Sequence, residues 1–257
     1  MIHSTAIIHP GAQLHESVKV GPYSVVDEHV TLGAGCELDP HVHLTGHTVI
    51  GTENRFHTGC VIGDAPQDMK YSCEPTRLII GNRNIFREHV TVHRSNTLEE
   101  YTQLGSEIFL MANSHVGHNA IIGNKAILAN GVLIAGHAMI GDGAFLAGNA
   151  VVHQFCRVGA MAMMQGCAGV SLDLPPFTIM RGINGMCGLN SVGLKRAGFS
   201  AEERQQLKKA YHAIFLSGDL MKDALEKART DCSGVLAEQL IDFVSASQRG
   251  TCSHVRR

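Results

Sequence analysis

The sequence predicts a parallel β-helix of hexapeptide repeats, followed by a small C-terminal helical domain. An aliphatic residue recurs every six positions over residues 2–170, and a small residue often follows it. After Pro175 this pattern gives way to amphipathic helical segments. We therefore expect a β-helix domain over residues 1–185 and a helical domain over residues 186–257.

The six-residue period is the strongest signal in the sequence. Of 29 positions spaced six apart, 27 are apolar, against about 13 expected by chance from the 44% hydrophobic content (29 × 0.44). The glycines that often follow suit a tight corner. Three hexads make one triangular coil of about 18 residues, so the stretch gives about nine coils, stacked about 4.8 Å apart. The sequence lacks the 3.6-residue period of an amphipathic helix over this stretch.

The composition suits such a repetitive structure. The 257 residues include 28 glycines, no Trp and only 5% aromatic residues, which excludes a core built around large rings. The formal net charge of −2 gives no sign of a nucleic-acid partner or of membrane-surface binding.

The N-terminal segment MIHSTAIIHPGAQ has neither a basic start nor a long apolar run. It predicts no signal peptide and no transmembrane segment, so we expect a cytoplasmic protein. The eight cysteines show no paired CxxC spacing and are expected to be reduced thiols.

Two polar segments interrupt the period and are expected to project from a coil corner. DAPQDMKYSCEPTR covers residues 64–77, and HRSNTLEEYTQ covers residues 93–103. Loops on a rigid solenoid often carry function, although a tolerated surface insertion explains them equally well.

The C-terminal part contains a capping-box pattern, in which Ser200 and Glu203 precede an amphipathic helix that ends near Gly218. Further helices are expected over residues 219–229 and 233–247. This domain would cap the end of the solenoid, which otherwise exposes strand edges.

Four of the 16 histidines are expected to lie along one strip of the surface. His118 and His137 are 19 residues apart, close to one coil, and His153 follows 16 residues later. His115 precedes His118 on the same turn. A lone histidine at a corner is usually only a polar surface residue, but a strip of imidazoles is typical of a functional site.

Two chemistries would use this strip. Imidazole is a good zinc ligand, but the sequence offers no carboxylate or thiol partner at an obvious position. Alternatively, one histidine acts as a general base while the others bind polar substrate groups. Gly136 favours the second chemistry, because its backbone N–H would bind an oxyanion beside the histidines. We expect no metal and no cofactor.

Several motifs resemble the UDP-N-acetylglucosamine O-acyltransferases, which catalyse the first step of lipid A biosynthesis. They are NSHVGHNAIIGN, IAGHAMIGD, AVVHQFCRVGA, GCAGVSLDLPP and GLNSVGLKRAGFS. The resemblance runs over nearly the whole chain, and HQF, PQDMKY and GLKRAGFS carry it most specifically.

The resemblance implies a left-handed β-helix in a homotrimer with sites between subunits. It implies transfer of a 3-hydroxyacyl chain from acyl carrier protein to the 3-position of UDP-N-acetylglucosamine. His118 corresponds to the catalytic base and the Gly136 amide to the oxyanion donor, and Gly166 to the position that limits acyl chain length. The positions that correspond to substrate contacts, the last two of them toward the nucleotide and its phosphates, are Asp68, Lys70, His93, His115, His137, His153, Gln154, Asn190 and Arg196.

The chain departs from the family pattern at three positions. Asn119 stands where an aspartate usually follows the catalytic histidine, Val192 where a glutamate is common, and Ala197 where a second arginine is usual. An amide orients the imidazole but offers less charge compensation than a carboxylate. Since an unprotonated amine demands less from a base than an alcohol does, one hypothesis is that the acceptor carries a 3-amino group.

Three alternatives stay open at this point. A γ-class carbonic anhydrase has the same β-helix and binds zinc through histidines across a subunit interface. A non-catalytic β-helix would serve as an assembly subunit. The glucosamine N-acyltransferase that acts two steps later usually carries an extra N-terminal domain, whereas the repeat here begins at Ile2.

Acyl carrier protein is acidic, so a basic docking surface is expected. The candidate residues are Lys195, Arg196, Arg204, Lys208 and Lys209.

Overall fold

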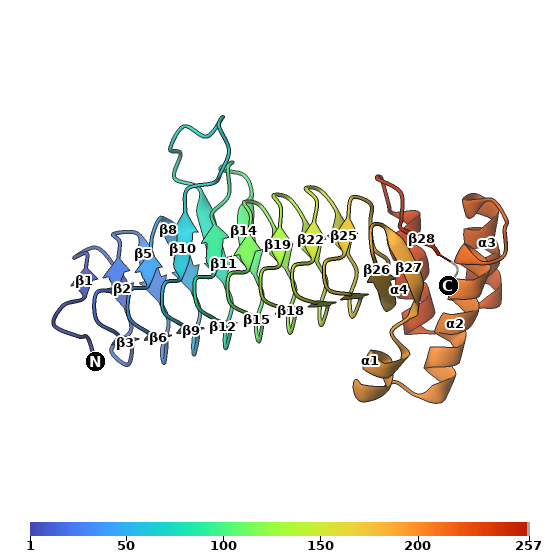
Figure 1. Cartoon of the computed structure of the whole chain (residues 1–257), viewed down its shortest axis with the longest axis horizontal. Coiled ribbons are helices and arrows are strands. Elements are labelled where there is room, and N and C mark those ends of the chain that lie inside the picture. Colours follow the sequence, from blue (N-terminus) through green and yellow to red (C-terminus); the bar gives the residue numbers. More distant parts are fainter. Residues whose placement is uncertain (256–257) are drawn as a thin grey trace.

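In the computed structural model, which describes residues 1–255, the chain forms an elongated stack of coils that ends in four helices (Figure 1). Each coil has three sides, and each side pairs in parallel with the same side of the neighbouring coils. The three sides thus become three long sheets. The predicted parallel β-helix is confirmed.

The strands of the three sheets are two to five residues long. The first sheet has the order β1-β4-β7-β10-β13-β16-β19-β22-β25, with the bounds Ile7–Ile8, Val25–Val26, His43–Leu44, Val61–Asp64, Thr91–His93, His115–Val116, Leu133–Ile134, Val151–Val152 and Gly169–Val170. The second has the order β2-β5-β8-β11-β14-β17-β20-β23, with the bounds Gln13–Leu14, Val30–Leu32, His47–Ile50, Arg77–Ile80, Tyr101–Leu104, Ile121–Ile122, Met139–Ile140 and Arg157–Val158. The third contains, in chain order, β3, β6, β9, β12, β15, β18, β21, β24, β26, β27 and β28, with the bounds Lys19–Val20, Glu37–Leu38, Arg55–Phe56, Ile85–Phe86, Phe109–Leu110, Ile127–Leu128, Phe145–Leu146, Met163–Met164, Thr178–Arg181, Gly185–Leu189 and Ser253–His254.

The residue that recurs every six positions points into the coil, as predicted for almost all of the stretch. Val116, Ile134 and Val152 are paired in register on successive coils and are at most 2% exposed. The prediction is wrong for Ile2, in the first coil, and for Leu98, which lies in a loop; these two side chains are 53% and 54% exposed.

Most of the glycines that follow the inward residues have a different role from the one predicted, and Gly63, with a left-handed φ of 86°, is the exception. Gly33 needs no left-handed backbone, but a Cβ atom there would lie 2.6 Å from the carbonyl oxygen of Gly51 on the next coil. Close approach of stacked backbones therefore excludes a side chain. The left-handed corners fall on other residues, most of them not glycine, and one column of them is Asn113, Gly131, Asn149 and Cys167.

Both predicted loops are shorter than expected, because strand pairing continues into their ends. The first covers residues 65–76 between β10 and β11, and the second covers residues 94–100 between β13 and β14. Both rise from the same edge of the stack (Figure 1). The side-chain amide of Asn96 donates to Asp68 Oδ2 over 2.9 Å, which ties the two loops together.

The C-terminal part begins with strands that the sequence analysis missed. After Pro175 and Pro176, β26 continues the third sheet, β27 pairs with it in antiparallel orientation, and β28 pairs with β27. The boundary predicted after residue 185 lies inside β27, and we keep the two-domain division as a proposal.

The helices are α1 (Ser191–Arg196), α2 (Ala201–Phe215), α3 (Met221–Asp231) and α4 (Val235–Ser245). The capping box of Ser200 and Glu203 is confirmed at the start of α2, whereas α1 was not predicted. The buried faces of α2 and α4 join the same apolar core as the coils. An Arg157–Asp173 ion pair of 2.7 Å and a hydrogen bond from Arg157 to the Phe243 carbonyl attach α4 to the stack. Within residues 1–255, no helix is long and apolar enough to cross a membrane.

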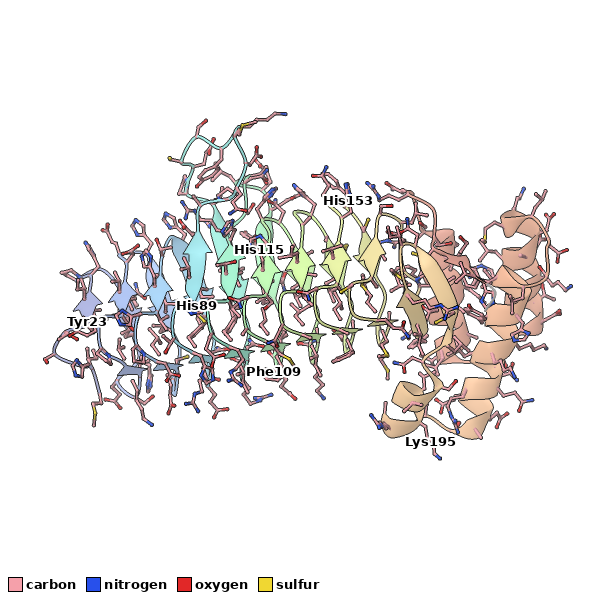
Figure 2. All side chains as sticks on the ribbon, viewed as in Figure 1. Tyr23, His89, Phe109, His115, His153 and Lys195 are labelled. Carbon is pink, nitrogen blue, oxygen red and sulfur yellow. The ribbon has the colours of Figure 1, made fainter. Side chains whose placement is uncertain are left out.

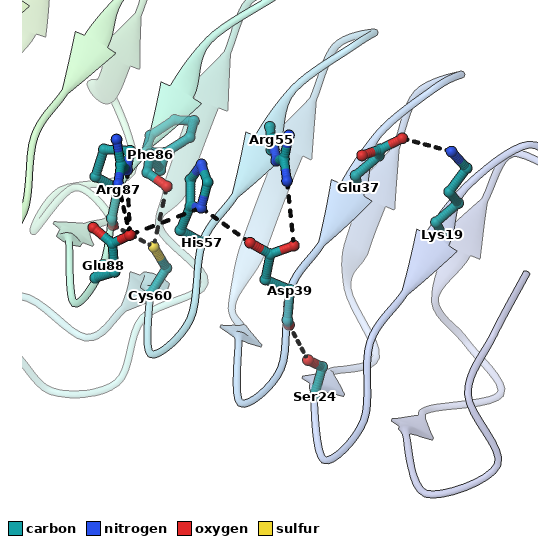
Figure 3. A network of polar contacts seen from close by, with 10 residues as sticks. All are labelled: Lys19, Ser24, Glu37, Asp39, Arg55, His57, Cys60, Phe86, Arg87 and Glu88. Carbon is teal, nitrogen blue, oxygen red and sulfur yellow. Dashed lines mark hydrogen bonds and ion pairs between the residues drawn. The ribbon is translucent and has the colours of Figure 1, made fainter.

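The outward side chains of the third sheet change from charged to apolar along the stack. In the first coils Lys19 pairs with Glu37 over 2.7 Å, and Asp39 lies 3.0 Å from His57 Nδ1 (Figure 3). Further along, the in-register outward residues form what we call the apolar strip: Phe109, Ile127, Phe145 and Met163.

The glycine contacts predict a position-specific loss of stability. Gly33→Ala should lower the free energy of unfolding by about 1–3 kcal/mol, because its Cβ meets backbone atoms that side-chain rotation cannot move. Gly148→Ala is the matched control, since its Cβ would lie 3.5 Å from the nearest atom, an ordinary contact. Thermal and urea unfolding of the two variants tests this. Equal midpoints for the two variants would contradict it.

Candidate active site

A groove of about 870 Å³ runs along the outer surface of the first sheet. Its floor is apolar, with Leu133 and Val151 exposed by 47% and 42%. Figure 2 shows His115 and His153 on the same side of the stack. The sequence-predicted residues that line the groove are His93, His115, His118, Gly136, His153 and Gln154.

The other predicted site residues lie around the groove or away from it. His137 packs edge-on against His118, with ring centroids 5.2 Å apart. Asp68 and Lys70 lie on the first loop, whose Gln67 lines the groove, and Gly166 adjoins the lining residue Cys167.

Asn190 and Arg196 are not brought to the groove by the described part of one chain. Asn190 caps α1, its side chain donating to the carbonyl oxygen of Met161, and Arg196 is in the last turn of α1. Figure 2 shows Lys195 of α1 on the side of the molecule opposite His115 and His153.

The coil register places Gly136 directly beside the ring of His118. These residues are 18 apart, and a Cβ at Gly136 would lie 2.7 Å from His118 Nε2. A side chain at position 136 would therefore displace this imidazole. Within residues 1–255 the Gly136 amide N–H makes no hydrogen bond, so it is available to a ligand in the groove.

The tautomer of His118 follows from its contact with Asn119, whose Oδ1 lies 2.9 Å from His118 Nδ1. Asn119 Oδ1 also accepts from the backbone N–H of Asn96, and Asn119 Nδ2 donates to Glu100 Oε2 over 2.6 Å. A backbone N–H only donates and a carboxylate only accepts, so these two contacts fix the orientation of the amide. His118 Nδ1 must then carry the proton, and Nε2 has its lone pair free on the groove side.

His93 and His115 form a polar pair in the lining of the groove, in which His93 is buried and His115 is partly buried. Their rings meet edge-on at 4.9 Å, and His115 Nδ1 lies 2.7 Å from Thr91 Oγ1. Burial, and then the positive charge that His93 and His118 would carry, lower the pKa of His115 to about 4. Burial likewise lowers the pKa of His93, whose Nδ1 has no hydrogen-bond partner within residues 1–255. Both rings are therefore neutral at pH 7 and present hydrogen-bonding groups without a charge.

His153 and His137 are oriented by their own neighbours. His153 Nδ1 donates to the carbonyl oxygen of Gln154 over 3.1 Å, which leaves its Nε2 as an acceptor. The ring of His137 stacks on Phe155 at 4.7 Å. Burial lowers the pKa of His137, and the nearby His118 lowers it further, against the opposing effect of Glu100.

Sequence analysis missed the residues that support His118. Glu100 and Asn96 reach His118 through Asn119, from a loop that the six-residue period does not align with it, and Thr91 contacts His115 from the neighbouring coil. Because Glu100 lies on a loop outside the period, spacing alone does not place its carboxylate beside Asn119. Within residues 1–255, no group of three or more His, Cys, Asp or Glu side chains has the geometry to hold a metal ion.

Comparison with known proteins agrees with the resemblance in sequence. A family model described as UDP N-acetylglucosamine O-acyltransferase, domain 2, matches residues 173–252. The acyl-[acyl-carrier-protein]--UDP-N-acetylglucosamine O-acyltransferase of Herminiimonas arsenicoxydans is 44% identical, over 97% of this chain and 98% of the relative. The chain belongs to the UDP-N-acetylglucosamine O-acyltransferase family. The relative of the same name from Thermodesulfovibrio yellowstonii is 42% identical over 98% of both chains.

Solved structures of the family superpose on the whole fold. The UDP-N-acetylglucosamine acyltransferase of Francisella novicida has a TM-score of 0.94 at 36% identity, covering 100% of this chain and 95% of its own. LpxA of Acinetobacter baumannii has a TM-score of 0.94 at 38% identity, covering 97% and 98%. The left-handed β-helix with a C-terminal helical part is thereby confirmed for this member of the family.

The environment of His115 predicts an unusual titration. Its NMR ring signals should shift with a midpoint at about pH 4, because burial disfavours the charged imidazolium. Selective labelling of histidine and comparison with His115→Asn identifies the signal. A midpoint near 6.5 would show that water reaches the ring freely and would contradict the packing described here.

Proposed function

We propose that this chain transfers a 3-hydroxyacyl group from acyl carrier protein to the 3-position of UDP-N-acetylglucosamine, with His118 as general base. The observation that carries the proposal is the pairing of His118 with the Gly136 amide. A bare imidazole nitrogen and an unpaired backbone N–H lie side by side on one apolar groove. The relatives named above act on an acyl carrier protein and UDP-N-acetylglucosamine.

The geometry supports a two-step acyl transfer. His118 Nε2 takes the proton of the acceptor as its oxygen, or nitrogen, attacks the thioester carbonyl carbon. The carbonyl oxygen becomes an oxyanion that accepts a hydrogen bond from the Gly136 N–H. When the tetrahedral intermediate collapses, the C–S bond breaks and the imidazolium returns its proton to the leaving thiolate.

The remaining groups divide between the two substrates. The neutral ring of His115, with His153 and Gln154, offers hydrogen bonds to the sugar and the acyl hydroxyl. The apolar floor around Leu133 and Val151 suits the acyl chain. Gly166 leaves space beside Cys167, since a Cβ there would meet its nearest atom only at 3.4 Å.

A basic surface on α2 suits the acidic acyl carrier protein. Arg204, Lys208 and Lys209 line a second hollow of about 630 Å³ next to α1. Complementary charge of this kind speeds association and sets orientation more than it adds affinity.

We propose that a second copy of the chain completes the site and that the protein is a homotrimer. By the resemblance, Asn190 and Arg196 contact the nucleotide. They stand at the two ends of α1, whose Lys195 lies on the opposite side of the molecule from His115 and His153 (Figure 2), so we infer that they reach a substrate from a neighbouring subunit. The apolar strip supplies an outward surface for such contacts. Closed cyclic symmetry would give each copy one complete site.

The trimer predicts a mass of about three times 27.6 kDa in light scattering. Charges placed in the apolar strip, as in Phe109→Glu with Ile127→Glu, should lower the mass to that of one chain and abolish transfer. Matched changes on the exposed first coil, such as Ile7→Glu, should leave both unchanged. A monomeric wild-type protein with full activity would contradict this assembly.

The activity itself is tested with 3-hydroxyacyl carrier proteins of several lengths and two acceptors, UDP-N-acetylglucosamine and its 3-amino analogue. His118→Ala should lower kcat by about 10²–10⁴-fold, the usual contribution of a general base, while His15→Ala on an early coil keeps full activity. The better acceptor decides between hydroxyl and amine. No transfer by the wild-type protein to either sugar would contradict the proposal.

A further inference from the structure

We propose that Glu100 is a positioning residue for His118, and that it supplies through Asn119 the negative charge that the residue next to His118 lacks. The inference rests on the proposed function of His118 as base. It concerns a residue outside the repeat, on the second loop, whose carboxylate faces the back of the candidate base.

The contact between Glu100 and Asn119 is short and well defined. Glu100 Oε2 accepts from Asn119 Nδ2 over 2.6 Å, and Asn119 is only 5% exposed. A hydrogen bond to an ionised acceptor is stronger than one between neutral groups. The amide passes this polarisation on, because its other end accepts from His118 Nδ1 over 2.9 Å.

This chain of contacts places a negative charge near the ring on which the proposed reaction creates a positive one. When the ring takes a proton from the acceptor, the positive charge is stabilised by a carboxylate one amide away. A directly bonded carboxylate would act more strongly, since the interaction falls with distance. The side chain of Glu100 is 57% exposed, so solvent screens part of its charge.

Glu100 also contacts a second ring of the site. Its Oε2 atom lies 3.4 Å from His137 Nδ1, and the ring of His137 packs edge-on against that of His118. One carboxylate thus approaches His118 from behind, through Asn119, and from the side, through His137. The other titratable groups that face His118 are Asp68, His93 and His115.

The amide keeps other partners when Glu100 is replaced. Asn119 Nδ2 also donates to Ser95 Oγ over 3.0 Å, and its backbone N–H donates to Thr102 Oγ1 over 2.7 Å. We therefore expect variants at Glu100 to fold and to keep Asn119 in place. This separates a charge effect from a loss of structure.

The test compares Glu100→Gln with Glu99→Gln, which removes the same charge from the neighbouring exposed position on the same loop. Glu100→Gln should lower kcat about tenfold with little change in KM, equal to about 1.4 kcal/mol of transition-state stabilisation. Its acid limb in kcat against pH should move to lower pH, because loss of a carboxylate disfavours the imidazolium. Glu99→Gln should match the wild type in both.

A charge relocation gives a second arm. Asn119→Asp alone sets two carboxylates against each other. It should raise kcat less than the double variant Asn119→Asp/Glu100→Gln, in which the new carboxylate contacts His118 directly and faces no second carboxylate. The double variant should regain at least wild-type kcat. Equal pH profiles and kcat values for Glu100→Gln and Glu99→Gln would overturn the inference.

NMR titration of His118 without substrates distinguishes the two possible failures. A lower ring pKa in Glu100→Gln than in Glu99→Gln supports the contact even if the wild-type protein transfers no acyl group, in which case the proposed function fails alone. An unchanged ring pKa in an active enzyme overturns the role of Glu100 alone.

Discussion

Stacking of inward aliphatic side chains in register is the interaction on which the rest of the structure depends. Val116, Ile134 and Val152 lie over one another in the coil interior. Burial of such side chains drives the stacking, and the parallel backbone pairing between coils holds each coil at a fixed height above the last. Outward residues 18 apart are therefore aligned as well, which is how Gly136 comes to lie beside the His118 ring. The site is a consequence of the core register, since no local motif holds these two residues together.

The two loops matter because they break this register at one edge. A perfectly periodic solenoid repeats similar side chains along each column, so its surface does not surround any one side chain with different polar groups. The loops add two groups that the period does not place, the backbone N–H of Asn96 and the carboxylate of Glu100. Both form hydrogen bonds with the side chain of Asn119. The Asn96–Asp68 hydrogen bond holds the loops against each other. The periodic coils thus supply His118 and Asn119, and the aperiodic loop supplies the groups that hold Asn119.

This division also decides what the sequence could predict. The coils, the inward residues and the alignment of His118 with Gly136, 18 residues apart, follow from counting, because they obey the period. The contacts of Glu100 cannot be predicted by counting, since the length of a loop does not indicate which way its side chains point. The strands after Pro175 were missed for a related reason: β26 keeps the sheet pairing but lacks the hexad spacing. The role of the glycines was misjudged because spacing cannot distinguish a left-handed corner from a close approach of backbones.

The corner that carries Asn119 explains why its exchange for aspartate is an electrostatic question alone. Asn119, His137 and Phe155 form one column of left-handed residues, with φ of 59°, 58° and 63°. Asparagine and aspartate both tolerate this conformation better than most residues. The two side chains also have nearly the same shape, so the backbone and the packing do not choose between them.

What differs is the charge next to His118 and the ability of Nδ2 to donate to Glu100. An aspartate here would face Glu100 with like charge, whereas asparagine accepts from the imidazole and donates to the carboxylate at once. Asn119 and Glu100 therefore act as one unit: Glu100 supplies the negative charge from the loop, and the Asn119 amide connects it to His118.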